Sequence, residues 1–158
     1  MKNKIRIIGM LLVLCMVVLL LISCGGTNVE KSGKATVVIE SAEGEYTTYA
    51  VDLSKLKSYD EGVLSLLKYL NSIEENPLSF SASWGSYGAY LTSVGGISED
   101  ANNGKYIYIY TTNGEDFDTS VWVKSLEYDT RLFKSSGVGA SQMNIKDGTV
   151  ILFRLEGF

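Results

Sequence analysis

The sequence predicts an α+β fold, in which a small, mostly antiparallel sheet carries one helix packed across it. Three observations predict this arrangement. Apolar and polar residues alternate with a period of two in several segments, as half-buried strands require. After residue 34 only one segment shows helical spacing of its apolar residues. A late segment, residues 149–155, is apolar almost throughout, which is typical of a strand buried on both faces.

The strands are expected in a definite order. Residues 36–39 and 46–53 are rich in β-branched and aromatic residues and flank the turn Glu43-Gly44, so they predict a hairpin. A second pair is expected on either side of the glycine-containing turn 84–88. Three more strands are expected over 105–111, 120–128 and 149–155, the last of them in the centre of the sheet.

The single helix is expected between Ser58 and Pro77. Ser58 and Glu61 have the spacing of a capping box, in which each side chain bonds to the other residue's backbone amide. Pro77 ends the helix because the residue before a proline avoids the helical conformation. One apolar stripe follows the cap, and its members are Val63, Leu66, Leu67, Leu70 and Ile73. The stripe must pack on something, most simply on one face of the sheet.

The first residues predict export and anchoring. Three basic residues precede an uncharged apolar run, residues 7–22, which has the layout of a secretory signal and is short for a membrane-spanning helix. Cys24 follows Leu21-Ile22-Ser23, a pattern that resembles the lipobox of bacterial lipoproteins. That resemblance implies a lipid on Cys24 and cleavage just before it. We therefore expect a signal peptide at 1–23, a flexible tether at 24–34 and one domain at 35–158, held on the extracytoplasmic face of the membrane by its lipid anchor.

Composition excludes several functions. The chain contains no His, so catalysis by Ser-His-Asp or Cys-His groups is impossible and the commonest transition-metal ligand is missing. The net charge of −4 argues against nucleic acid as a partner, and loss of the basic leader makes the remainder more acidic. No constellation of catalytic residues is visible, so we expect a protein that is not an enzyme and has no cofactor of its own.

Aromatic residues are the candidate binding groups. Trp84, Tyr87 and Tyr90 surround closely spaced glycines, where a backbone can approach a ligand and rings can lie against it. Trp122, within the strand expected at 120–128, is the fourth candidate. The alternative is that these rings, like the stripe at Tyr106, Tyr108 and Tyr110, simply pack between strands and helix or face water.

A metal site is not expected. Asp116, Asp118, Ser120 and Glu127 have the spacing of a calcium-loop template, but Val121 stands where that template requires glycine. The segment therefore favours an acidic turn and strand over a calcium loop.

The order of the segments resembles the transcobalamin-like C-terminal domain of bacterial surface lipoproteins. The resemblance covers about residues 35–156 and is most specific in the run Tyr87–Ile97, which reads YGAYLTSVGGI. Other matching segments are Thr36–Ile39, Gly62–Leu70, Gly139–Ser141 and Ile145–Phe153. The resemblance implies a β-grasp-like outline with one helix laid across the sheet. In vitamin B12 carriers, such a domain closes over one face of the corrinoid.

Together these observations lead to an expected role in capturing a small molecule outside the membrane. The resemblance implies a corrinoid, taken up through a membrane importer, as one candidate ligand. The alternative is a non-catalytic module that binds another protein or a glycan at the cell surface through a sheet face or an exposed strand edge.

Overall fold

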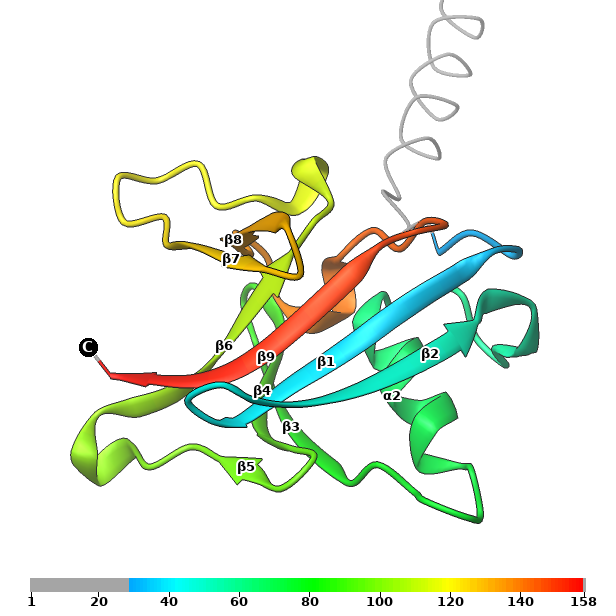
Figure 1. Cartoon of the computed structure of the whole chain (residues 1–158), viewed down its shortest axis with the longest axis horizontal. Helices are drawn as coiled ribbons and strands as arrows, with labels where there is room; N and C mark the ends of the chain where they lie inside the picture. Colours follow the sequence, from blue (N-terminus) through cyan, green and yellow to red (C-terminus); the bar gives the residue numbers. More distant parts are fainter. Residues whose placement is uncertain (1–28, 158) are drawn as a thin grey trace, which may run out of the picture.

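The computed structural model describes residues 29–157 and shows a mostly β protein with two sheets and one α-helix (Figure 1). The expected α+β class, with a small β-grasp-like antiparallel sheet, is therefore wrong. The larger sheet has six strands, is mixed rather than antiparallel, and curls into a half-barrel. The α-helix is only nine residues long, so strands form most of the architecture.

The six-stranded sheet joins the two ends of the domain. Its strand order is β2-β1-β9-β6-β8-β7. Strand β1 pairs antiparallel with β2 and parallel with β9, and β9 pairs antiparallel with β6. The strands are β1 (Lys34–Ala42), β2 (Glu45–Asp52), β6 (Lys105–Thr111), β7 (Ser125–Tyr128), β8 (Arg131–Ser135) and β9 (Val150–Gly157). The parallel pair places the last strand in the middle of the sheet, as its apolar sequence predicts.

The second sheet is smaller and antiparallel. It has the order β3-β4-β5, with β3 at Phe80–Gly85, β4 at Gly88–Val94 and β5 at Ile97–Ser98. Helix α2 (Val63–Asn71) precedes it and buries its apolar stripe in the same core. In Figure 1 this sheet and α2 lie on the same side of the long strands β1 and β9.

Two apolar clusters lie on opposite faces of the six-stranded sheet. The larger one contains Ile39, Ile107 and Phe153 together with α2 and β4. The smaller one contains Tyr110 and Phe133 and is covered by β7 and β8. Both faces are buried because the sheet curls, which explains why β9 has no polar face over its first four residues.

Three local expectations are corrected. The predicted capping box does not form, because the N-cap residue of α2 is Gly62 and Glu61 instead pairs with Lys68 at 2.6 Å. The strand predicted over 120–128 begins only at Ser125, and residues 120–124 form a loop. Strand β8 was not predicted at all; it pairs with β7 across a turn in which Asp129 and Thr130 adopt positive φ.

The predicted signal peptide, Cys24 and residues 24–28 of the predicted tether lie outside the described residues. The remainder of the tether, from Val29, contacts the domain. Val29 is buried and forms a parallel bridge with Ile145, and the amide of Glu30 donates to the Ile145 carbonyl at 2.9 Å. Within residues 29–157, no helix has the length and apolar character needed to cross a membrane.

Candidate functional site

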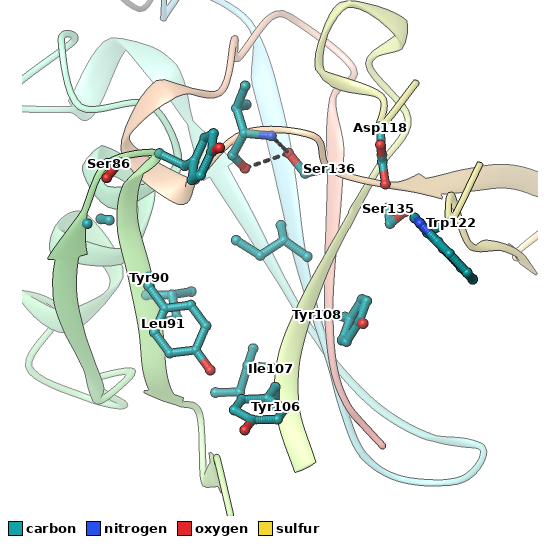
Figure 2. Close-up of a pocket in the computed structure, with 17 residues that line it drawn as sticks. Ser86, Tyr90, Leu91, Tyr106, Ile107, Tyr108, Asp118, Trp122, Ser135 and Ser136 are labelled. Carbon is teal, nitrogen blue, oxygen red and sulfur yellow. Dashed lines mark hydrogen bonds between the residues drawn. The ribbon is translucent and has the colours of Figure 1, made fainter. Parts of the chain in front are cut away.

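A pocket of the described domain lies between β4 and β6 (Figure 2). Its volume is about 500 Å³. Aromatic and aliphatic side chains dominate the lining, and Asp118 is its only charged residue. The lining residues come from four segments: Gly85–Leu91, Tyr106–Ile109, Asp118 with Trp122, and Ser135–Gly139 without Gly137.

The pocket runs along strand edges rather than over a sheet face. Four successive residues of β6, from Tyr106 to Ile109, line it, and so do four successive residues of β4, from Gly88 to Leu91. Successive side chains of a strand point to opposite faces. Both kinds of side chain can reach one pocket only if the pocket opens at the edge of the strand. The site is therefore a gap between two sheets whose edges face each other.

Tyr90 is fixed on the β4 wall by a carboxylate. Its hydroxyl donates a hydrogen bond of 2.6 Å to Glu99, just after β5. Partial burial, followed by this hydrogen bond and the negative charge of Glu99, raises the pKa of Tyr90 well above its ordinary value. The phenol therefore stays neutral at physiological pH and presents its ring to the pocket.

Tyr108 is fixed on the β6 wall by a cation. The ammonium of Lys124 lies 4.2 Å from the centre of the Tyr108 ring and 2.6 Å from the carboxylate of Glu156. Hydrogen bonding to Glu156 raises the pKa of Lys124, so the ammonium keeps its charge. The hydroxyl of Tyr110 donates to the same carboxylate at 2.5 Å. In Figure 2, Tyr108 lies on the side of β6 that faces Trp122, across the strand from Tyr90.

Trp122 reaches the pocket from the loop before β7. Its amide donates to the Ser120 hydroxyl at 3.2 Å, and both the amide and the hydroxyl of Ser120 donate to Asp118. Lys124 closes the loop through two hydrogen bonds with Ser135 of β8. The indole remains 82% exposed, so it forms a lip of the pocket that a ligand could cover.

Tyr87 forms the opposite lip, at the tip of the β3–β4 hairpin. Its carbonyl accepts a hydrogen bond of 2.8 Å from the amide of Gly139, and the next residue but one, Ala89, donates to the Ser141 hydroxyl at 2.9 Å. Its side chain is 79% exposed. The hairpin tip is thus held by backbone contacts while its ring stays accessible.

The structure brings together three of the four residues that the sequence singled out. Tyr87, Tyr90 and Trp122 all line the pocket, whereas Trp84 is exposed on β3 and does not. Whether the three bind a ligand stays a prediction.

Sequence reasoning did not select Tyr106 and Tyr108, which also line the pocket. The alternating tyrosines of 105–111 were the available signal. However, Tyr110 of the same stripe is buried in the smaller cluster, so alternation alone could not tell pocket from core.

No group of three or more Asp, Glu, Cys or His side chains in the described part of the chain is placed to hold a metal ion. Asp116, the most buried carboxylate of the suspected calcium template, instead accepts hydrogen bonds from Asn113 and Asn144.

Comparisons with known proteins identify the fold. No protein-family model matches the chain, and no curated protein matches it. A solved protein from Ruminococcus gnavus, provisionally described as metal-binding, matches 80% of this chain and 99% of its own at a TM-score of 0.54 and 13% identity. Haptocorrin, solved in complex with Cbi, matches 87% of this chain at a TM-score of 0.53 and 14% identity. The fold is transcobalamin-like.

The transcobalamin-like fold expected from the family resemblance is thus confirmed, whereas its β-grasp-like description is wrong because the large sheet is mixed and curled. At these identities the transcobalamin-like matches establish the fold alone. The chain spans only 28% of the haptocorrin chain, so the activity of that whole protein does not carry over with the fold.

Proposed function

We propose that the pocket between β4 and β6 captures a small molecule with a flat, largely apolar ring system, and that a corrinoid is the first ligand to test. The observation that carries the proposal is the aromatic lining: Tyr87, Tyr90, Tyr106, Tyr108 and Trp122 converge on one gap from three separate segments. Rings placed in this way can stack on a flat ligand or contact its edge.

The size and polarity of the pocket support the same proposal. A volume of about 500 Å³ lies within the range of small-molecule sites, which are mostly apolar with a few polar groups. Apolar surface covered on binding contributes roughly 25 cal/mol per Å². A corrinoid is larger than the pocket, so the lips Tyr87 and Trp122 would contact one side of it and leave the other exposed.

The neighbour haptocorrin, solved with Cbi, supports a corrinoid over other ring-shaped ligands. A calorimetric titration of the purified chain tests this choice. Cobinamide is expected to bind with saturable, stoichiometric heat, and glucose, a neutral sugar of low apolar area, is expected to give none. Absence of binding by both cobinamide and cobalamin would contradict the corrinoid assignment.

We propose further that the domain acts as a binding protein rather than an enzyme. Asp118 is the only carboxylate of the pocket, and both of its oxygens already accept hydrogen bonds from Ser120. These bonds hold the carboxylate on its own loop, whereas a general base must lie within hydrogen-bond reach of the proton that it removes. The chain also lacks His, the usual alternative. Incubation with excess cobinamide is therefore expected to return the ligand unchanged, as chromatography of the mixture can show.

The proposed location is the extracytoplasmic face of the membrane, with the chain held by lipid on Cys24. The leader and Leu21-Ile22-Ser23-Cys24 support this assignment. Cells grown with a radioactive fatty acid are expected to label the wild-type protein but not the Cys24→Ala variant. Equal labelling of both would reject the anchor. A membrane importer that receives the captured ligand is the partner this location would favour.

A further inference from the structure

Within residues 29–157, strand β6 has no neighbouring strand between Lys105 and Ile109 on the edge that lines the pocket. At the start of β6, the amide and carbonyl of Lys105 both bond to Asp100, at 2.9 and 2.8 Å. Four residues later, the carbonyl of Ile109 accepts the Ser136 amide at 2.8 Å. Both contacts lie on the edge of β6 that faces away from β9.

Ile107 lies midway between these two contacts. Backbone groups of alternate residues in a strand point to the same edge, so the N–H and C=O of Ile107 point away from β9 and toward the pocket. Its only register partner within residues 29–157 is Leu155 on β9, at a position where the two strands do not exchange hydrogen bonds. No described side chain bonds to these two groups, although the residue is only 6% exposed.

Backbone groups on such an edge can bond to water in the pocket, and a ligand that displaces this water has to replace both bonds. A neighbouring strand would normally supply one acceptor and one donor side by side. We propose that Ile107 recognises amide chemistry of the ligand: an amide N–H of the ligand donates to the Ile107 carbonyl, and an amide C=O of the ligand accepts from the Ile107 N–H. This assignment rests on the proposed pocket. It specifies which polar group of the ligand is recognised, whereas the aromatic side chains contact its apolar parts.

The surroundings favour an amide over other polar groups. A carboxylate offers acceptors only and would also approach Asp118, the single charged group of the lining. An ester keeps the acceptor but has no donor for the Ile107 carbonyl. Tyr106 and Tyr108 flank Ile107 on the same strand, so an apolar ring attached to the amide would lie against them.

Two sources of ligand carry this chemistry: the carboxamide side chains of a corrinoid, and the backbone of a short peptide. Four probes separate them. They are cobinamide; its neutral ester counterpart, heptamethyl cobyrinate; a dipeptide, N-acetyl-valyl-valine methylamide; and the same dipeptide with its central amide replaced by an ester. Each ester partner keeps the carbonyl acceptors and loses amide donors, and heptamethyl cobyrinate also lacks the terminal hydroxyl of cobinamide.

The test is hydrogen exchange of the backbone amides, followed by NMR on the isotope-labelled full chain, together with the affinity of each probe. With an amide probe bound, exchange of the Ile107 N–H is expected to slow at least tenfold. The amides of Tyr106 and Tyr108, which point toward β9, serve as internal controls and should change little. The ester partner is expected to bind about tenfold more weakly, as the loss of one hydrogen bond implies.

The outcomes distinguish this inference from the corrinoid proposal. Binding of cobinamide with unchanged Ile107 exchange, or equal affinity of an amide and its ester, would overturn the role of Ile107 and leave corrinoid capture standing. Binding of the dipeptide alone, with Ile107 protected, would support the amide inference and reject the corrinoid. If none of the four probes binds, both are rejected.

Discussion

The Tyr90 hydroxyl donates a 2.6 Å hydrogen bond to the Glu99 carboxylate, which joins one wall of the pocket to the segment after β5. The backbone supports the same junction, since the Glu99 amide donates to the Thr92 carbonyl at 3.0 Å. The bond therefore fixes the orientation of the Tyr90 ring through Glu99, a residue that does not itself line the pocket.

Removal of this bond from either side is expected to lower the free energy of unfolding slightly, and the effects of the two substitutions should overlap. Tyr90→Phe and Glu99→Gln should each lower the free energy of unfolding by up to about 1 kcal/mol, because the pair is partly exposed and screened. The double variant should lose less than the sum. Denaturant titrations of the four proteins measure the coupling, and strict additivity would show that the bond contributes nothing.

Stability is expected to fall at alkaline pH. Burial first, and then donation to Glu99 and Glu156, raise the pKa values of Tyr90 and Tyr110 in the folded protein. The unfolded chain ionises its tyrosines near the ordinary value of about 10. The stabilising contribution is therefore complete below that pH and is lost as the pH rises above it.

Unfolding titrations at pH values between about 8 and 12 can measure this loss. The Tyr110→Phe variant should show a shallower decline than the wild type above pH about 10, and the same slope below it. Parallel curves for the two proteins over the whole range would contradict the raised pKa of Tyr110.

Two glycines that line the pocket should differ in their tolerance of alanine. A Cβ on Gly139 would lie 2.2 Å from the Tyr87 carbonyl oxygen and 2.9 Å from that of Ala89, so the hairpin tip would have to move. A Cβ on Gly85 meets nothing within 4 Å. Gly139→Ala is expected to destabilise the fold by about 2 kcal/mol and to weaken ligand binding, whereas Gly85→Ala should change stability by less than about 0.5 kcal/mol. Thermal denaturation and ligand titration of both variants test the pair; equal behaviour would contradict the docking of the hairpin tip.

Asp116 is expected to hold the turn after β6 against the segment that precedes β9. Its buried carboxylate accepts from the backbone and side-chain amides of Asn144 and from the side chain of Asn113. Asp116→Asn replaces an acceptor by a donor, and should lower the free energy of unfolding by about 2–3 kcal/mol. Glu43→Gln, in the exposed turn between β1 and β2, is the matched control and should have no effect. A loss as small as that of the control would refute this role.

Local patterns predicted local structure well. The turn Glu43-Gly44, the hairpin around 85–88 and the helix after Gly62 all follow from turn residues and apolar spacing over a few positions. The near-continuous apolar run of β9 also placed that strand correctly in the sheet centre.

Strand partnership and the pocket could not be predicted in the same way. The parallel pairing of β1 with β9 joins the two ends of the domain, and alternation reports the face of a side chain but not its partner strand. Trp122 has the apolar neighbours of a strand, yet hydrogen bonds among Asp118, Ser120 and its own amide fold the segment into a loop. Tyr106 and Tyr108 belong to the site because one edge of β6 faces β4. This placement depends on the tertiary structure, which local sequence patterns do not reveal.

The central claim, that the gap between β4 and β6 is a ligand site, is tested most directly by the chain's two tryptophans. Trp122 lines the pocket and Trp84 lies outside it, with both side chains largely exposed. Each of the variants Trp84→Phe and Trp122→Phe therefore keeps a single fluorescent reporter. On titration with cobinamide, a strong absorber, Trp84→Phe is expected to show saturable quenching, while Trp122→Phe should show clearly weaker quenching and lower affinity. Equal saturable quenching in the two variants, or no saturable quenching in either, would contradict the account.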